Sequence, residues 1–364
     1  LYFKILYYLF MKNKSIKIGV IGAGWWATSH HIPTLKRRKE VILDSVCRIG
    51  KRELLDIKDR FGFHFATEDY KELLKRNLDG VIISSPHGMH YIHSKDALES
   101  NANVLIEKPM ATKTSEALDL INTANKKNLT ILMSHSWNYL KISKLAKEKI
   151  KDGCIGKIES IVCNQISGVR ELLQGSQWKL SGPEIMYSPQ PSTWSDPETA
   201  KGGYGLAQMT HSIALVCFIT DLIPQRVFSL DTPSEELELY KSITLECESK
   251  FVATFTGSSS YLNTYDNCKI IVFGDKGTLV MNIGKEGFDT TNNRLEIYKK
   301  DKEKFIFKET NENKFDSFQP TNNFVDIILD PKNINLSKGS LGVKTTQILD
   351  ASYRSNSSKK LENI

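Results

Sequence analysis

The chain reads IKIGVIGAGWWA over residues 16–27, an apolar run followed by a glycine-rich turn. The apolar run predicts a buried strand, and the turn carries Gly22, Gly24 and Ala27 in the spacing G-x-G-x-x-A. Between a strand and a helix, this spacing indicates a dinucleotide-binding site. Gly22 permits the tight turn, Gly24 lets the backbone approach a pyrophosphate, and Ala27 keeps helix and strand close. We expect a nicotinamide dinucleotide here; the alternative is a glycine turn that serves packing alone.

Around this turn, from Ser15 to about Tyr139, short apolar stretches alternate with amphipathic ones. The stretches VILDSVC, DGVIISSP and ANVLIEKP predict strands, whereas RELLDIKDRFG, HYIHSKDALES and SEALDLINTANKKN predict helices. Such alternation is typical of a parallel sheet with helices on both faces. Right-handed crossovers bring the carboxyl ends of all its strands to one edge, where we expect the ligand.

The pattern changes after a helix that ends at Gly153. The stretches KIESIVCNQISG, LYKSITLECES, FVATFTGSSSYL and CKIIVFG predict strands joined by short turns, and helical spacing returns in NNFVDIILD and GVKTTQILDASYRS. This pattern favours an open, mainly antiparallel sheet with one covered face. The sequence therefore predicts an α/β protein with a Rossmann domain over residues 15–138 and a second α/β domain over 139–364. Residues 1–14 are interpreted as an extension outside the fold.

Composition excludes several classes of protein. The 364 residues carry a net charge of +7, but the lysines are spread along the chain, so we expect no nucleic-acid partner. Six cysteines without a C-x-x-C pair favour neither a zinc site nor a disulfide scaffold, and they fit a reducing, cytoplasmic location. The apolar residues 1–10 are too short to span a bilayer, although a membrane-surface anchor is the minority interpretation. We expect no metal and no membrane partner.

The segment after the second predicted strand should contact the ribose of the dinucleotide. An NAD enzyme needs a carboxylate there, whereas Asp44 lies back inside the strand and Glu53 already belongs to the next helix. Arg48, Lys51 and Arg52 stand in its place, and a guanidinium suits a 2′-phosphate through paired hydrogen bonds. We therefore expect NADP rather than NAD, the alternative being a solvated basic turn.

A second motif, Glu107-Lys108-Pro109, closes the predicted strand ANVLI, and the loop SSPHGMH, residues 84–90, closes the strand before it. Together with the glycine turn, these motifs resemble the glucose–fructose oxidoreductase / inositol dehydrogenase (Gfo/Idh/MocA) family. The stretches LMSHSWNYL, DGCIGKIESI, GGYGLAQMTHSIALVCFIT and LDASYRS follow in the family's order. The resemblance covers the chain from Ser15 onward.

This resemblance implies hydride exchange between nicotinamide and a secondary alcohol or carbonyl of a sugar or cyclitol. It implies that Lys108 contacts substrate and cofactor, that the Lys108–Pro109 bond is often cis, and that His211 acts as acid and base on the reacting hydroxyl. The chemistry is reasonable, because removing a hydride from carbon requires a group that takes the hydroxyl proton near neutral pH. It also implies a substrate-binding second domain whose sheet forms a homodimer or homotetramer.

The sequence departs from the family pattern beside His211. Many members carry Asp one helical turn before and one turn after this histidine, where this chain has Ala207 and Ala214. Gln208 is a candidate substitute for the missing acidic partner, and Lys108 is expected to carry more of the proton transfer. Two alternatives stay open: His211 is a satisfied helix histidine, or the protein is a catalytically silent NADP-binding sensor.

The remaining site residues follow from the motifs and the resemblance. The expected cofactor-binding residues are Gly22, Gly24, Trp25, Trp26, Ala27, Arg48, Lys51, Arg52, Ser85, Pro86, His87, His90, Glu107, Lys108 and Pro109. The expected substrate-binding residues are Lys108, Tyr139, Trp194, Gln208 and His211. Residues 170–201 predict a long irregular segment rich in aromatic side chains, which suits enclosure of a sugar ring or, alternatively, simple packing on the sheet.

Overall fold

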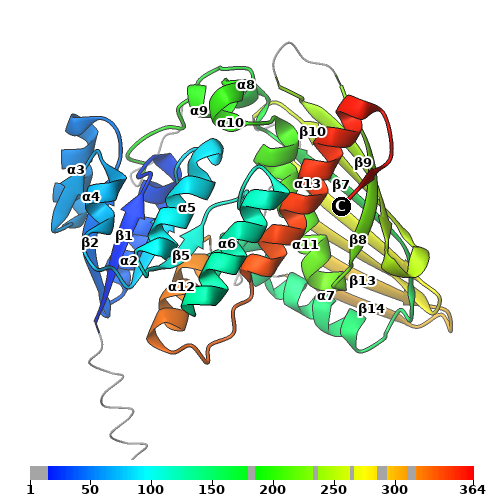
Figure 1. The fold of residues 1–364 in the computed structure, drawn as a ribbon. Helices are drawn as coiled ribbons and strands as arrows, with labels where there is room; N and C mark the ends of the chain where they lie inside the picture. The colour runs from blue at the N-terminus through cyan, green and yellow to red at the C-terminus, as the bar shows by residue number, and fades with distance from the viewer. Residues whose placement is uncertain (1–14, 179–184, 233–236, 263–265, 285–292, 310–316) are drawn as a thin grey trace, which may run out of the picture.

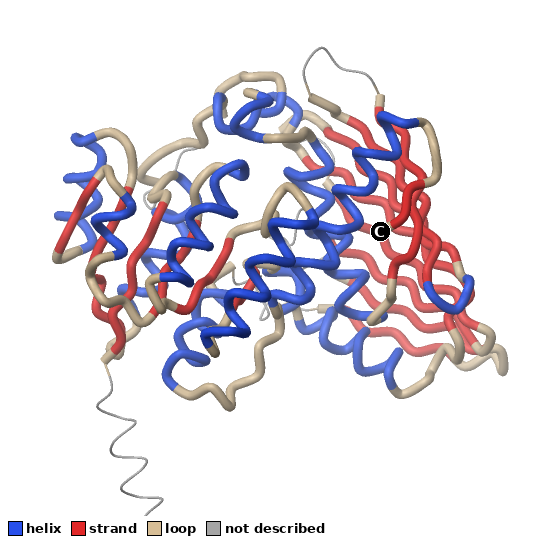
Figure 2. The backbone as a smooth tube through the Cα atoms, viewed as in Figure 1, coloured by secondary structure: helices blue, strands red, loops and turns tan. Residues whose placement is uncertain are grey.

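Figure 1 shows a computed structural model of the protein, which describes residues 15–178, 185–232, 237–262, 266–284, 293–309 and 317–364. The expected extension over residues 1–14 lies outside the described residues. The chain builds two separate sheets with helices beside and between them, as the red strands and blue helices of Figure 2 show. The smaller sheet holds the N-terminal strands, and the larger one holds the strands after residue 157.

The N-terminal sheet has six strands in the order β3-β2-β1-β4-β5-β6, all paired in parallel. Its strands are β1 (Ile16–Ile21), β2 (Val41–Cys47), β3 (Phe65–Thr67), β4 (Gly80–Ile83), β5 (Asn103–Ile106) and β6 (Ile131–Met133). This order confirms the predicted Rossmann sheet. β2 and β3 are added on one side of β1, and β4, β5 and β6 are added on the other side. The strand order therefore reverses between β1 and β4, and ligands bind at this point in such folds.

Helices cover both faces of this sheet. They are η1 (Ala27–His31) continuing into α2 (Ile32–Arg37), α3 (Lys51–Phe61), α4 (Tyr70–Leu74), η2 (His87–Met89) continuing into α5 (His90–Glu99), and α6 (Thr114–Lys127). One face buries apolar side chains of α2 and α3, and the other buries those of α5 and α6. Helix α3 ends where Gly62 adopts a φ of +84°, a conformation that costs glycine least.

The second sheet has nine strands in the order β14-β13-β12-β11-β7-β10-β9-β8-β15. Its strands are β7 (Ile158–Ser167), β8 (Pro224–Asp231), β9 (Tyr240–Cys247), β10 (Val252–Ser259), β11 (Asn267–Gly274), β12 (Gly277–Gly284), β13 (Arg294–Lys299), β14 (Lys304–Lys308) and β15 (Glu362–Asn363), with the short η5 (Glu248–Lys250) between β9 and β10. Only the pair β7 and β10 is parallel among its recorded pairings, which confirms the open, mainly antiparallel sheet.

Burial alternates along the strands of this second sheet, as the pattern of β10 illustrates. The buried side chains pack against helices α7 (Lys141–Lys151), α11 (Thr210–Thr220) and α13 (Gly339–Ser358). The opposite face carries exposed apolar side chains, among them Val162, Val252 and Phe273. One covered and one uncovered face is the arrangement that the alternating sequence pattern predicts.

Helix α12 (Gln319–Leu329) returns from the C-terminal part of the chain to the Rossmann sheet. Its Phe324 and Val325 are fully buried in the same apolar cluster as Ile16 of β1, and Asp326 accepts a 2.7 Å hydrogen bond from Arg38. In Figure 1 this orange helix lies below the N-terminal sheet. The division at residues 138/139 stays a prediction, and sequence analysis did not anticipate that a helix beyond it packs on the first sheet.

The segment over residues 170–201 is not irregular throughout, so that expectation was wrong in part. It contains α8 (Arg170–Leu173), α9 (Ser192–Ser195) and α10 (Pro197–Ala200), while residues 179–184 lie outside the described residues. Local chemistry explains α10: Asp196 accepts from the Glu198 N–H at 3.2 Å, and Pro197 occupies the first helical position. These short helices lie across the top of the molecule in Figure 1, between the two sheets.

Candidate cofactor and substrate site

The glycine turn is shaped by two glycines with different roles. Gly22 has a φ of +86°, and a Cβ atom there would lie 2.3 Å from the Ser85 nitrogen, so only glycine fits between the β1 and β4 loops. At Gly24 a Cβ atom would meet no heavy atom within 4 Å. The backbone at Gly24 therefore borders open space that a larger side chain would fill. This is the cradle that the motif predicts for a pyrophosphate.

The first N–H groups of the helix after this turn have no acceptor within the helix itself. The Thr28 N–H donates to the Gly24 carbonyl at 3.0 Å, and the N–H groups of Trp25, Trp26 and Ala27 precede it in the first turn, where a helix offers no internal acceptor. Such a helix start attracts anions through its free donors and its dipole. The residues present therefore fit a dinucleotide phosphate.

Arg48 stands at the end of β2, beside the glycine turn. Its guanidinium donates to the Ala23 carbonyl at 3.2 Å and lies 4.7 Å from the centre of the Tyr187 ring. Asp44 is engaged inside the sheet, where its carboxylate accepts 2.5 and 3.2 Å hydrogen bonds from Arg76. Lys51 begins α3 on the exposed side of this edge. The expected ribose end thus carries the cations Arg48 and Lys51, and the Glu68 carboxylate also lies there, where it accepts a 2.7 Å hydrogen bond from the Gly50 N–H.

Glu107, one of the expected cofactor-binding residues, forms a buried pair beneath the edge of the sheet. Its Oε1 lies 2.9 Å from Nε2 of His31, whose Nδ1 lies 2.7 Å from the hydroxyl of Thr321 on α12. Burial alone would raise the Glu107 pKa, but hydrogen bonds from His31 and Ser134, with the charge of Lys108, lower it to about 2. Glu107 is therefore ionised, and His31 connects it to Thr321 of α12. Sequence analysis missed His31 and Thr321.

Lys108 meets the helix that carries His211. Its Nζ donates to the Ala207 carbonyl at 2.6 Å, and Ala207 belongs to η4 (Gly205–Met209), which runs directly into α11. The Trp194 ring lies 5.6 Å from the same Nζ, and the Lys108–Pro109 peptide bond is cis. The structure therefore brings together Lys108, Trp194 and the turn before His211, which are far apart in sequence.

His211 stacks on Trp137, with ring centres 5.2 Å apart and planes at 28°. Its Nδ1 is buried and has no hydrogen-bond partner within the part of the chain that the structure describes. Burial, then the charges of Lys108 and His135, hold the His211 pKa well below its ordinary value. The imidazole is therefore neutral near pH 7, the form that accepts a proton. Gln208 is buried one turn earlier, as the sequence places it.

Sequence analysis missed His135 as a site residue. Ile106 of β5 pairs with Met133 of β6 in parallel. Lys108 follows Ile106 by two residues and His135 follows Met133 by two residues, so the two lie at matching positions beyond the strand ends. The His135 ring is 2% exposed, and neither nitrogen has a partner among the described residues. Burial lowers its pKa to about 4. The signals in the sequence were its place two residues after an apolar strand and its position in the stretch LMSHSWNYL.

Two other histidines join the loops at this edge. Nδ1 and Nε2 of His90 lie 2.6 Å from the Pro109 carbonyl and 2.7 Å from the Ser85 carbonyl, so this ring ties the β4 loop to the β5 loop. The His87 ring lies 6.1 Å from Trp194, and burial holds its pKa well below the ordinary value. Direct contacts of Ser85, Pro86, His87, His90 and Pro109 with a cofactor stay predictions.

The aromatic residues of the 170–201 segment lie along the edge of the Rossmann sheet. Trp178 lies 6.3 Å from Trp25, Tyr187 covers Arg48, and Trp194 covers Lys108. Trp25 and Trp26 also contact each other edge to face at 5.4 Å. The segment therefore borders three expected points of the dinucleotide site: the turn, the ribose end and the nicotinamide end.

Tyr139 lies deeper than an expected substrate contact. The residue is buried, and its hydroxyl donates to Asn323 of α12 at 2.8 Å. Burial raises the pKa of this hydroxyl, so it stays a donor. Its contact with substrate stays a prediction, and the observed bond fastens the segment after β6 to α12.

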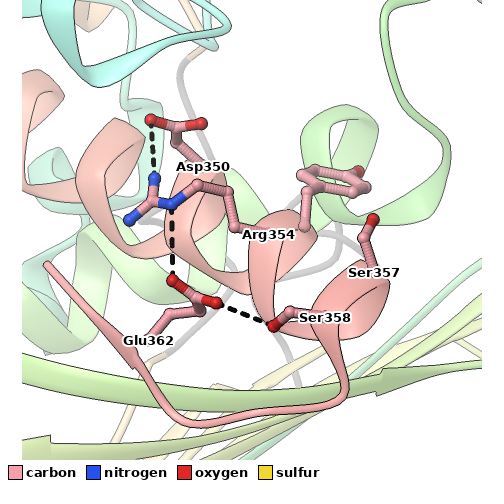
Figure 3. Close-up of a pocket in the computed structure, with 6 residues that line it drawn as sticks. Asp350, Arg354, Ser357, Ser358 and Glu362 are labelled. Atoms are coloured by element: carbon pink, nitrogen blue, oxygen red, sulfur yellow. Dashed lines mark hydrogen bonds and ion pairs between the residues drawn. The ribbon is translucent and has the colours of Figure 1, made fainter.

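A surface hollow lies elsewhere, beside the end of α13. Figure 3 shows Arg354 between Asp350 and Glu362, at 3.1 and 3.8 Å, with Ser358 donating to Glu362 at 2.7 Å. Exposed ion pairs of this kind contribute little stability, and we assign this hollow no role in the site.

The described ranges offer neither a cluster of metal-ligating side chains nor a helix fit to span a membrane. They contain no group of three His, Cys, Asp or Glu side chains placed to hold a metal ion. None of the helices that the structure describes is both long and apolar enough to cross a bilayer.

The fold and this edge define a two-domain α/β protein with a Rossmann dinucleotide-binding sheet. The family model described as "Oxidoreductase family, NAD-binding Rossmann fold" matches residues 16–135, and the "GFO/IDH/MocA C-terminal domain" matches residues 143–280. Together they cover most of the chain. The chain belongs to the Gfo/Idh/MocA oxidoreductase family, as the motifs around Gly22 and Lys108 predicted.

Among named relatives, glucose-6-phosphate 3-dehydrogenase of Bacillus subtilis is 32% identical over 145 residues, 40% of this chain and 41% of that protein. The scyllo-inositol 2-dehydrogenase (NADP+) of the same organism is 26% identical over 163 residues, 43% of this chain and 42% of that protein. These alignments thus span about two fifths of the relatives. The structure of levoglucosan dehydrogenase with NADH superposes with a TM-score of 0.79 and 14% identity, over 96% of this chain and 99% of that one, which shows the shared fold.

Proposed function

We propose that this protein is a dehydrogenase or reductase that transfers a hydride between a nicotinamide dinucleotide and a secondary alcohol or carbonyl of a sugar or cyclitol. The observation that carries the proposal is the meeting of Lys108 with the Ala207 carbonyl, one turn before His211, at the carboxyl edge of a Rossmann sheet. The names of two relatives, glucose-6-phosphate 3-dehydrogenase and scyllo-inositol 2-dehydrogenase (NADP+), support the substrate class.

The cofactor would be held by the glycine turn and the first turn of the helix after it. The open space at Gly24 and the N–H groups of Trp25 to Ala27 suit its pyrophosphate. When bound, the nicotinamide ring supplies a hydride acceptor or donor. Lys108, Trp194 and His87 border the end of the edge where that ring and the substrate are expected to meet.

Lys108 and His211 would divide the proton chemistry. The Lys108 ammonium is a hydrogen-bond donor that can hold and polarise the reacting oxygen. Neutral His211 can take the hydroxyl proton during oxidation, or return one during reduction. The charge of Lys108 is one cause of the low His211 pKa, so the two roles are coupled electrostatically. Without a carboxylate at Ala207 or Ala214, no acid at these positions stabilises a protonated His211.

We further propose that NADP is preferred over NAD. Arg48 stands beside the turn, and the carboxylate of Asp44, the acidic residue of β2, is bound to Arg76. Relatives of both kinds exist, since one relative is named for NADP+ and a similar structure is a complex with NADH. The preference therefore rests on the chemistry of Arg48 and its neighbours.

Assembly and location are further parts of the proposal. The uncovered face of the nine-stranded sheet exposes apolar side chains, including Val162, Val252 and Phe273, which suits a homodimer or homotetramer through this sheet. All six cysteines are free thiols, as expected of a cytoplasmic protein. Light scattering during size-exclusion chromatography of the full chain tests the assembly; a monomer at micromolar concentration would contradict it.

The central experiment measures binding first and turnover second. Quenching of protein fluorescence gives the Kd of NADPH and of NADH, and we expect NADPH to bind at least tenfold more tightly, about 1.4 kcal/mol. A panel of sugars and inositols, read by nicotinamide absorbance, then tests turnover. If the protein binds neither NADPH nor NADH, the whole dehydrogenase proposal is contradicted. Preference for NADH contradicts only the assignment of NADP.

The sensor alternative has less support. Lys108 and His211 are both present and lie at one edge, and the two relatives reported above are named as dehydrogenases. We therefore do not carry the sensor interpretation further.

A further inference from the structure

Tyr187 connects the second half of the chain to the expected ribose end of the cofactor site. Its ring centre lies 4.7 Å from the Arg48 guanidinium, within the range of a cation–π contact. Its hydroxyl donates to the Glu53 carbonyl at 3.2 Å, in the first turn of α3. Met186 and Tyr187 also pack against the apolar cluster of the Rossmann sheet. Tyr187 is therefore seated on the first domain through stacking, hydrogen bonding and apolar contact.

Arg48 is fixed from three directions. NH1 donates to the Ala23 carbonyl at 3.2 Å, Nε donates to the carbonyl of its neighbour Ile49 at 3.2 Å, and Cζ lies over the Tyr187 ring, 4.7 Å from the ring centre. A guanidinium carries five N–H donors in one plane, so fixing that plane fixes the direction of every donor. An ammonium in the same place would have no plane to fix.

The N–H donors of a guanidinium held in this way match an oxyanion, which they bind through paired hydrogen bonds. At the end of β2 that oxyanion would be the ribose 2′-phosphate, which distinguishes NADP from NAD. The charged groups that act on Tyr187 are Arg48, Glu53, Asp56 and Arg60, two of each sign. Burial raises the pKa of the Tyr187 hydroxyl, so it stays protonated and keeps its bond to the Glu53 carbonyl.

We propose that Tyr187 is a cofactor-specificity residue, which holds the guanidinium of Arg48 in the plane that receives a ribose 2′-phosphate. This inference rests on the proposed function, because it assigns a role within the same dinucleotide site. It adds that selectivity depends on a residue of the 170–201 segment, outside the Rossmann motif. NADH, which lacks the 2′-phosphate, gains little from the same stack.

The test compares Kd values of NADPH and NADH for the full chain carrying Tyr187→Leu, Tyr187→Phe or no substitution. Leu removes the stack, so we expect the NADPH Kd to rise about fivefold to tenfold with little change for NADH. Phe keeps the ring and should keep most of the preference. Tyr298→Leu is the matched control, since Tyr298 lies 4.5 Å from the Lys304 ammonium on the outer strands of the second sheet.

Each outcome decides the inference. Equal weakening of both dinucleotides, no change, or tighter binding in Tyr187→Leu would overturn it. If the wild-type protein binds NADPH and NADH equally, the inference about Tyr187 is overturned but the dehydrogenase proposal stands. If the wild-type protein binds neither dinucleotide, the inference and the dehydrogenase proposal are both overturned. If Tyr187→Leu does not fold, Arg48→Lys keeps the charge without the plane. That variant should lose the NADPH preference, and retained preference contradicts the role of the stack.

Discussion

The carboxyl edge of the Rossmann sheet has two halves that differ in chemistry. The outer half, at β1 and β2, consists of the glycine turn and Arg48, with open space at Gly24 and cations nearby. The inner half, at β5 and β6, consists of Glu107, Lys108 and His135 with His211 facing them from the second domain. The outer half offers donors to an anion, whereas the inner half keeps neutral imidazoles in a buried environment.

This contrast suggests a division of labour. Backbone N–H groups and a guanidinium suit binding of a charged ligand, because they keep their charge or polarity at any physiological pH. Burial lowers the pKa of His135 to about 4 and that of His211 well below its ordinary value, which keeps both imidazoles neutral near pH 7. We therefore expect substitutions in the outer half to change affinity and substitutions in the inner half to change turnover.

Lys108→Ala should have the largest effect and should confirm that the inner half serves turnover. Loss of the ammonium removes the donor to the reacting oxygen, and we expect kcat/KM to fall about 10³-fold, or about 4 kcal/mol. The NADPH Kd, measured by fluorescence, should change less than about threefold. Lys75→Ala, at an exposed pair with Glu72, is the control. Turnover near the wild-type rate in Lys108→Ala would remove Lys108 from the chemistry.

Glu107→Gln tests whether the inner half depends on a buried charge for its stability. The Glu107 pKa falls from 4.5 to about 2 in the folded protein, which corresponds to about 3 kcal/mol of stability at neutral pH. Because the folded pKa is the lower one, this contribution is complete above pH 4.5 and is lost as the pH falls toward 2. Glu107→Gln should therefore unfold at lower urea at pH 7, with a smaller difference at pH 3.

The control for this prediction is Glu72→Gln, since Glu72 is exposed and paired only with Lys75 on the same helix. Urea denaturation at pH 7, 5, 4 and 3 gives the free energy of unfolding of each variant. Parallel pH profiles for Glu107→Gln and the wild type would show that the carboxylate is not stabilised by folding.

Gly22→Ala and Gly24→Ala separate folding from binding within the outer half. At Gly22 the positive φ and the 2.3 Å approach to the Ser85 nitrogen predict a loss of about 2 to 3 kcal/mol of stability. At Gly24 the Cβ atom enters open space, so Tm should stay unchanged while NADPH affinity falls about tenfold. Differential scanning calorimetry and fluorescence titration measure the two effects. Equal Tm losses in both variants would contradict distinct roles.

The two halves also differ in how far sequence predicted them. Gly22, Gly24 and Ala27 lie in one turn and its following helix, so their spacing in the sequence was enough to predict a cofactor site there. Arg48 follows at the end of the next strand, where the register of a Rossmann sheet places the ribose. The parallel sheet itself was predictable for the same reason, because alternating strands and helices leave few topologies.

The inner half depends on contacts that have no local pattern. The Ala207 carbonyl accepts from Lys108 although the Ala207 side chain carries no polar group. His31 contacts Glu107 through one ring nitrogen and Thr321 of the returning helix α12 through the other. Burial of His135 is likewise a property of packing between elements. The family resemblance identified Lys108 and His211, but the partners of each were visible only in three dimensions.

Arg48→Ala should have an effect as small as that of Gly24→Ala, and it tests the chemistry of the outer half most directly. Truncation removes the contact to a 2′-phosphate but leaves the glycine turn, so we expect the NADPH Kd to rise about tenfold and the NADH Kd to stay within about twofold. Lys51→Ala, which removes a cation from the same edge without a planar fork, should weaken NADPH less and in a salt-dependent manner. Titrations at low and high salt distinguish the two. If both variants lose NADPH affinity equally and salt abolishes the difference, the outer half attracts the phosphate through net charge, and the geometry of Arg48 has no role in selecting it.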